Sequence, residues 1–159
     1  MRIQTGDRIP LAILSQMSEN GPQTVNTTDY FAGRKIVLFS VPGAFTPTCS
    51  AYHLPGYIEH HDEFTVKGID AIACMSVNDV FVMHAWGKSA KADGIDMLAD
   101  GNGEFARALG LELDGTAFGM GHRAQRFALV ADDGIVTRLM VEAPGEFRVS
   151  SAESVLASL

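Results

Sequence analysis

The chain has 159 residues, 47% of them hydrophobic and 19% charged, a composition that suits one globular domain covering residues 1–159. Its formal net charge of -7 argues against a surface for nucleic acid or anionic membranes, and no apolar run is long enough for a membrane span. With two cysteines and no recognisable secretion leader, we expect no disulfide framework and a location in the reducing cytoplasm.

The hydrophobic pattern predicts an α/β chain. Residues 1–34 are rich in turn formers and are expected to be irregular. A strand is predicted at 35–41, then a helix at 47–65 with a break at Pro55-Gly56, and a second strand at 69–77. A helix follows from an Asp79 cap to Trp86 and stops near Gly87, and after it come a strand at 96–99 and a helix at 103–109. The last elements are strands at 127–131 and 135–141, joined by Asp132-Asp133-Gly134, and a helix at 151–158. This order predicts a central mixed sheet covered by helices.

The stretch VPGAFTPTCS ends the first buried strand and opens the first long helix. Thr46 suits the N-cap and Pro47 the first helical position, so Cys49 falls third in the helix. Unpaired amide N–H groups and the helix dipole favour a thiolate there. Hydroxyls of Thr46 and Thr48 can donate to the sulfur or to a substrate, and Pro42 can shield it from water. The alternative is a cysteine that is simply packed at an ordinary helix start.

The segment from Pro42 to Ser50 resembles the peroxidatic motif of the peroxiredoxins, Pro-x-x-x-Thr-x-x-Cys. The following HLPG, which begins at His53, narrows the resemblance to the type II, or peroxiredoxin 5, branch. Two later segments, 76–87 and 123–134, are similar to the same branch in the expected order. The resemblance implies a thioredoxin-like fold with the N-terminal additions of peroxiredoxins.

The resemblance also implies an activity, the thiol-dependent reduction of hydrogen peroxide and alkyl hydroperoxides without a metal or organic cofactor. By motif position, Cys49 matches the peroxidatic cysteine, which becomes a sulfenic acid. Thr46 matches the residue that hydrogen-bonds the peroxide, Pro42 the shielding proline, and Arg126 the active-site arginine. A low-turnover peroxide sensor or redox relay that uses the same cysteine is the alternative function.

Several neighbours are expected to line or support the pocket: Gly43, Phe45, Thr48, His53 and Arg123. Arg123 is either a second positive charge at the site or a surface residue, and the sequence leaves this open. His53 lies one helical turn after Cys49. We expect it to support the structure, although a cysteine hydrolase would use it as a general base. A metal site built from the cysteines and His53 has unsuitable spacing, so no metal is expected.

Cys74 falls inside a predicted buried strand, where it should behave as a small hydrophobic residue. No cysteine follows it, so a resolving disulfide near the C-terminus is impossible. We therefore expect an external thiol to reduce Cys49, and local unfolding that lets Cys74 act as the resolving cysteine is the alternative. The resemblance implies glutaredoxin with glutathione, or thioredoxin, as the reductant, and a homodimer with contacts near the active site.

Overall fold

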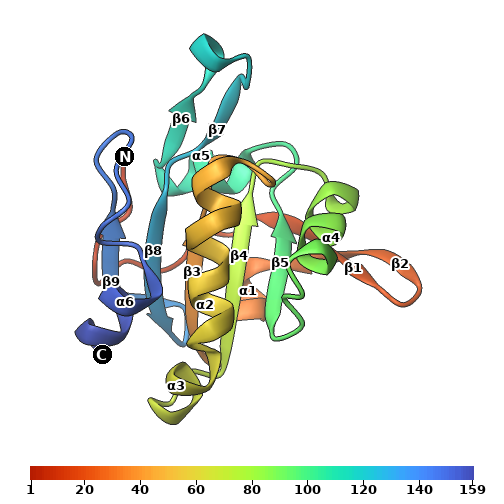
Figure 1. Ribbon diagram of the computed structural model, residues 1–159. Helices are drawn as coiled ribbons and strands as arrows, with labels where there is room; N and C mark the ends of the chain where they lie inside the picture. The colour runs from red at the N-terminus through yellow and green to blue at the C-terminus, as the bar shows by residue number, and fades with distance from the viewer.

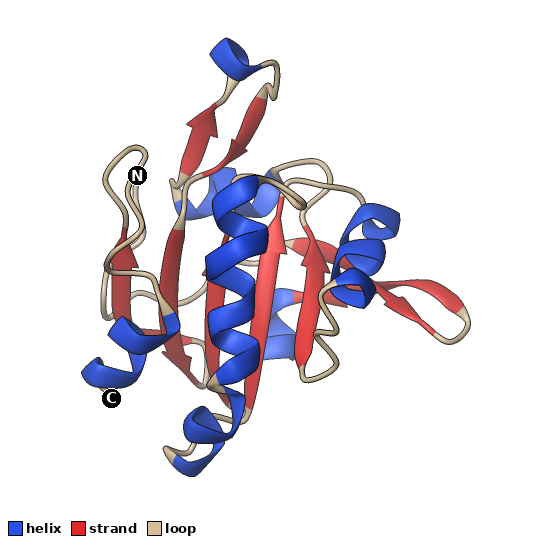
Figure 2. Cartoon of the chain, in the orientation of Figure 1, coloured by secondary structure: helices blue, strands red, loops and turns tan.

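A seven-stranded mixed sheet runs through the middle of the molecule, and helices cover both of its faces (Figures 1 and 2). The computed structural model describes all residues from 1 to 159. The strands are β1 (Ile13–Ser18), β2 (Gly21–Asn26), β3 (Lys35–Ser40), β4 (Ala71–Ser76), β5 (Ile95–Ala99), β6 (Glu112–Asp114), β7 (His122–Ala124), β8 (Phe127–Asp132) and β9 (Ile135–Val141). The helices are α1 (Thr27–Phe31), α2 (Leu54–Glu59), α3 (His61–Val66), α4 (Val80–Ser89), α5 (Glu104–Leu109) and α6 (Ala152–Ser158), with a π-helical turn η1 (Cys49–His53) and a 3-10 turn η2 (Thr116–Phe118).

The order across the sheet is β2-β1-β5-β4-β3-β8-β9, while β6 and β7 form a separate ribbon. The central strands β3, β4 and β5 are parallel, and antiparallel strands extend the sheet on both sides. Side chains of β3 are buried on both faces, with Val37 and Phe39 in one apolar cluster and Ile36 and Leu38 in the other. The predicted mixed sheet flanked by helices is confirmed.

The two apolar clusters correspond to two layers of helices. Tyr57 of α2, Trp86 of α4 and Val155 of α6 pack on one face of the sheet, together with α3. Phe31 of α1 and Phe105 of α5 pack on the other face. Figure 1 shows α2 lying across β3 and β4, in front of the sheet. None of the helices has both the length and the apolar character that crossing a lipid bilayer requires.

The N-terminal segment is more ordered than predicted, so the expectation that residues 1–34 are irregular is wrong. β1 and β2 form an antiparallel hairpin at the sheet edge, and the Asn26 side chain caps α1 by accepting the Thr28 amide N–H at 2.8 Å. Only one residue of β2, Val25, is buried, so the strand lacks the apolar alternation by which a strand is recognised. The three-residue strands β6 and β7 were missed because they are too short to show a period.

The helical segment after β3 is interrupted at a different place from the one predicted. The break lies at His60, between α2 and α3, and not at Pro55-Gly56. Pro55 lies in the first turn of α2, directly after a π-helical turn, and the helix runs through it without a break. The turn before it is π-helical, with the Leu54 N–H bonded to the carbonyl oxygen of Cys49, five residues earlier.

Other predicted elements agree within a few residues. Asp79 caps α4 as predicted, accepting the Val82 amide N–H at 2.8 Å. However, α4 does not stop at Gly87 but continues to Ser89. Gly87 serves packing, since a Cβ there would lie 2.8 Å from the Cγ of Met97. The helix therefore needs the small residue to lie against β5.

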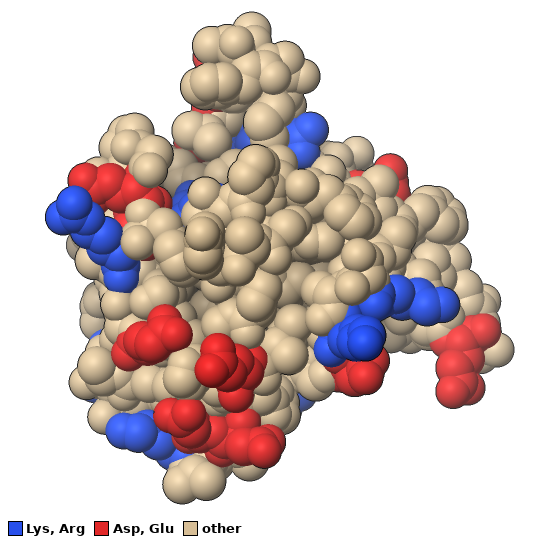
Figure 3. All heavy atoms as spheres, in the orientation of Figure 1, with Lys and Arg blue, Asp and Glu red and all other residues tan.

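His60 ties the break between α2 and α3 to the C-terminal helix. Its Nδ1 lies 2.7 Å from Glu63 Oε1 and its Nε2 3.1 Å from Glu153 Oε1, in a region where acidic side chains gather (Figure 3). The Glu63 hydrogen bond raises the pKa of His60, burial opposes this rise, and the Glu153 hydrogen bond adds to it, so that the pKa is raised overall. The protonated imidazole therefore stabilises the fold below its unfolded pKa, and this stability is lost as pH rises through the folded pKa.

We expect His60→Gln to lower the Tm more at pH 5.5 than at pH 8.0, because the charge on wild-type His60 is lost as the pH rises through its folded pKa. Thermal unfolding at both pH values measures this difference. The matched control is His84→Gln, because His84 is exposed on α4 and makes no ion pair. An equal loss at the two pH values would contradict the electrostatic account.

Candidate active site

Cys49 lies where the loop after β3 enters a helix. Pro47 is the first helical residue, and the Ser50 amide N–H donates to the Thr46 carbonyl oxygen at 2.9 Å. Cys49 is therefore the third helical residue, as predicted. The Thr46 hydroxyl does not cap the helix: it donates to the Gly43 carbonyl oxygen at 2.7 Å, and its oxygen accepts no amide N–H of the helix. Its oxygen lone pairs are left to accept a hydrogen bond from a bound molecule.

The loop between β3 and this helix is held from two sides. The Ala44 amide N–H donates to Asn78 Oδ1 at 3.0 Å. Gly43 fits closely, since a Cβ there would lie 3.0 Å from the Met120 side chain. Phe45 has a φ of 65°, and its side chain points outward with 52% of its surface exposed. Tight local packing thus positions the helix start that carries the sulfur.

Arg126 reaches the sulfur from the sheet. It immediately precedes β8, whose first residue, Phe127, pairs with Ser40 at the end of β3. This pairing brings Arg126 beside the helix start, and its Nη2 donates to Cys49 Sγ at 3.2 Å. A guanidinium stays protonated in proteins, so at this distance it stabilises negative charge on the sulfur or on an oxygen next to it.

His53 faces the other arm of the same guanidinium. Its Nδ1 lies 2.8 Å from Arg126 Nη1, and its Nε2 lies 3.0 Å from the Ser150 carbonyl oxygen. Because the guanidinium can only donate, Nδ1 accepts and Nε2 carries the proton. Burial, and then the Arg126 charge, lower the pKa of His53 to about 3. His53 is therefore neutral with both nitrogens occupied, which leaves no free nitrogen for the general base of a cysteine hydrolase.

The chain after β9 closes the site from the C-terminal side. The Ser150 carbonyl oxygen also accepts the Tyr57 hydroxyl, at 2.7 Å. The centroids of the Phe147 and His53 rings lie 4.9 Å apart. The guanidinium carbon of Arg126 lies 5.8 Å from the centroid of the Phe147 ring. None of Tyr57, Phe147 and Ser150 was identified from the sequence as a site residue.

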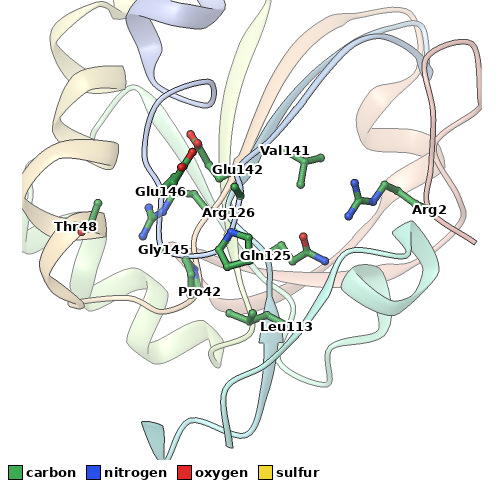
Figure 4. Close-up of a pocket in the computed structure, with 12 residues that line it drawn as sticks. Arg2, Pro42, Thr48, Leu113, Gln125, Arg126, Val141, Glu142, Gly145 and Glu146 are labelled. Carbon is green, nitrogen blue, oxygen red and sulfur yellow. The ribbon is translucent and has the colours of Figure 1, made fainter. Parts of the chain in front are cut away.

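A cavity of about 660 Å³ opens beside the guanidinium (Figure 4). Pro42, Thr48 and Arg126 line it, and so do Arg2, Leu113, Gln125 and residues 141–146. Of the five neighbours predicted to line or support the pocket, only Thr48 lies in the cavity wall, and the other four do not: Gly43, Phe45, His53 and Arg123. Cys49 itself has no exposed surface, so the sulfur lies beneath the cavity wall and meets it through Arg126.

Arg123, on β7, does not contact the sulfur. Its Nε donates to the Met120 carbonyl oxygen at 2.8 Å, and its Nη1 would lie 3.4 Å from a Cβ on Gly43. The side chain is half-buried beside the loop, so it is neither a free surface residue nor a hydrogen-bond partner of Cys49. Its positive charge therefore lies beside the loop that joins β3 to the helix of Cys49.

Cys74 is completely buried in β4, opposite Phe39 of β3, and both cysteines are free. Burial, followed by the nearby Cys49 charge, raises the pKa of Cys74 well above its ordinary value. A thiol in this environment is a poor nucleophile. No group of three or more His, Cys, Asp or Glu side chains is arranged as metal ligands would be.

Comparison with known proteins places these features in a family. The family described as Redoxin matches residues 4–156. The chain is 50% identical to Peroxiredoxin-2B of Arabidopsis thaliana over 159 residues, covering 99% of this chain and 98% of that protein. It is 51% identical to the chloroplastic Peroxiredoxin-2E-2 of Oryza sativa subsp. japonica, covering 99% and 72%. Its structure is similar to that of reduced Prx3 in complex with hydrogen peroxide from Vibrio vulnificus, with a TM-score of 0.96, 53% identity and 98% of each chain covered.

Proposed function

Since this chain belongs to the peroxiredoxins, within the Redoxin family, and is a thiol peroxidase, we propose that Cys49 is its peroxidatic residue and that an external thiol recycles it. The observation that carries the proposal is the 3.2 Å contact between Cys49 Sγ and Arg126 Nη2 at the start of a helix. The guanidinium and the helix start together place two sources of positive potential at one sulfur.

In the proposed reaction, the Cys49 thiolate attacks the distal oxygen of a hydroperoxide. An S–O bond forms as the O–O bond breaks, and the leaving alkoxide or hydroxide takes up a proton to give an alcohol or water. The product on the protein is Cys49 sulfenic acid. Arg126 stabilises the charge as it moves from sulfur to the leaving oxygen. The Thr46 hydroxyl oxygen accepts a hydrogen bond from the peroxide O–H, which orients the substrate, and Pro42, which has no N–H of its own, shields the sulfur from water.

We propose both hydrogen peroxide and alkyl hydroperoxides as substrates. The cavity of about 660 Å³ supports this range, because it is larger than hydrogen peroxide needs. Leu113 and Val141 in its wall offer apolar surface to an alkyl group.

The proposed reductant is an external thiol system, either glutaredoxin with glutathione or thioredoxin, in the reducing cytoplasm. Complete burial of Cys74 supports this choice, since its sulfur must leave the sheet before it can meet Cys49. We expect Cys74→Ser to keep most of its peroxidase turnover, because an external thiol does not depend on that side chain. NADPH oxidation coupled to each reductant system measures turnover for the variant and the wild type.

Two outcomes of that assay point elsewhere. A large loss of turnover in folded Cys74→Ser would restore Cys74 as the resolving cysteine. Stoichiometric oxidation of Cys49 without repeated turnover, under either reductant, would indicate a peroxide sensor or redox relay. Mass spectrometry of peroxide-treated protein shows which cysteine gains oxygen and so keeps the two outcomes distinguishable.

We also propose a homodimer formed near the site. Phe45 and Phe81 support it, with 52% and 64% of their surfaces exposed, and Phe45 lies beside Trp86 of the same helix that carries Phe81. Exposed aromatic side chains of this kind are enriched at protein interfaces. Sedimentation of wild type and of Phe81→Glu would test the dimer.

A further inference from the structure

Glu142 holds the chain that follows β9 in a closed loop by hydrogen bonds. Its Oε2 accepts three hydrogen bonds, from the Arg148 amide N–H at 2.8 Å, the Ser150 amide N–H at 2.8 Å and the Ser150 hydroxyl at 2.6 Å. The side chain is 7% exposed. One carboxylate oxygen thus fixes where the Ser150 backbone lies.

The position of Ser150 in turn determines the state of His53. The Ser150 carbonyl oxygen accepts from His53 Nε2 at 3.0 Å, so Nδ1 is left as the acceptor for Arg126 Nη1 at 2.8 Å. The second arm of the guanidinium then points at Cys49 Sγ, 3.2 Å away. A continuous series of hydrogen bonds therefore leads from Glu142 to the reacting sulfur.

We propose that Glu142 is a positioning residue for peroxide reduction, which acts on Cys49 through Ser150, His53 and Arg126. This inference rests on the proposed role of Arg126 in the reaction. Glu142 makes no ion pair with Arg126 and reaches the guanidinium through the hydrogen-bonded series, while its negative charge also acts on the neighbouring His53. The loop that it closes also holds Phe147 against both His53 and Arg126.

A contribution to folding stability does not by itself account for a buried carboxylate at position 142. Glu142 Oε1 is buried and has no hydrogen-bond partner, an arrangement that opposes folding. Burial acts to raise the pKa of Glu142, but the hydrogen bonds from Ser150 and Arg148 outweigh it and lower the pKa overall. The group is therefore ionised at neutral pH, and its full charge strengthens the three bonds that hold the Ser150 backbone in place.

A double-mutant cycle tests the inference. We expect Glu142→Ala to lower the second-order rate constant for hydrogen peroxide about tenfold in the wild type, but to change it little in an Arg126→Ala background. The reason is that a residue acting only through Arg126 has nothing to position once the guanidinium is gone. Glu142→Gln, which keeps one acceptor oxygen, should recover part of the rate and also serves if the alanine variant fails to fold.

The control is Asp100→Ala, on the other face of the sheet. Asp100 is likewise buried and accepts two backbone amide N–H groups, those of Phe105 and Ala106, so its loss should lower stability without changing the peroxide rate. A tenfold loss from Glu142→Ala in both backgrounds, or no loss in the wild type, would overturn the inference. An unchanged rate in the Arg126→Ala single variant would instead overturn the role of Arg126, and this inference with it.

Discussion

Cys49→Ser is expected to retain its fold and to lose all peroxide reduction above the uncatalysed background. A serine hydroxyl stays protonated where a thiol can ionise, and neither the helix start nor Arg126 makes it a nucleophile for the O–O bond. The side chain is nearly isosteric and fully buried, so the hydrogen bond from Arg126 Nη2 can be kept with oxygen in place of sulfur. Loss of activity would then report chemistry and not unfolding.

Peroxide consumption with an excess of reductant measures this loss, and circular dichroism checks the fold. The matched control is Cys74→Ser, which removes the other thiol from the same apolar cluster. In intact-mass measurements, peroxide should add oxygen to the Cys74→Ser protein and none to Cys49→Ser. Turnover that persists in Cys49→Ser would remove the proposed function.

Arg126→Ala is expected to lower the second-order rate constant for hydrogen peroxide by about two to three orders of magnitude. The guanidinium is the one charged group that donates a hydrogen bond to the sulfur, and it lies where the leaving oxygen must develop charge. Arg126→Lys should recover only part of the rate, because an ammonium cannot bond to His53 and Cys49 at once in the geometry of the guanidinium fork.

Trp86 offers a direct measurement of this step. It is the only tryptophan of the chain, and its Nε1 donates to the hydroxyl of Ser50, the neighbour of Cys49, at 3.0 Å. Stopped-flow fluorescence can therefore follow oxidation of the sulfur. Arg123→Ala is the control, since Arg123 carries the same charge without contacting the sulfur, and its effect should be much smaller. Equal losses in the two variants would mean that general positive potential matters and the hydrogen bond does not.

Local sequence was sufficient for the elements around the sulfur. A continuously apolar run predicted β3, and Thr46-Pro47 predicted a helix start with Cys49 third in the helix, because both depend on neighbours in the chain. The same reasoning failed for β2, which is a strand only because β1 pairs with it at the sheet edge. It also misplaced the end of α4, since the reason for Gly87 lies in Met97, on another element.

The sequence identified only some of the residues that act electrostatically on the sulfur. Arg126 was identified from a motif resemblance, 77 residues away from Cys49 along the chain, and no pattern near Cys49 indicates it. His53 was recognised as a supporting residue, but its tautomer depends on Ser150, which is 97 residues away. Glu142 gave no signal at all, because a single glutamate after a strand is normally exposed.

The amino-acid sequence by itself thus determined the strand, the turn and the helix start that present Cys49, because amide groups and proline act within a few residues. Only the tertiary structure decided which charged groups contact that sulfur and which thiol is buried out of its reach. The pairing of β3 with β8 brings Arg126 to Cys49, and the pairing of β3 with β4 buries Cys74. Hydrogen bonds and burial act through space over a few ångströms, so they depend on how distant segments pack and not on their order in the chain.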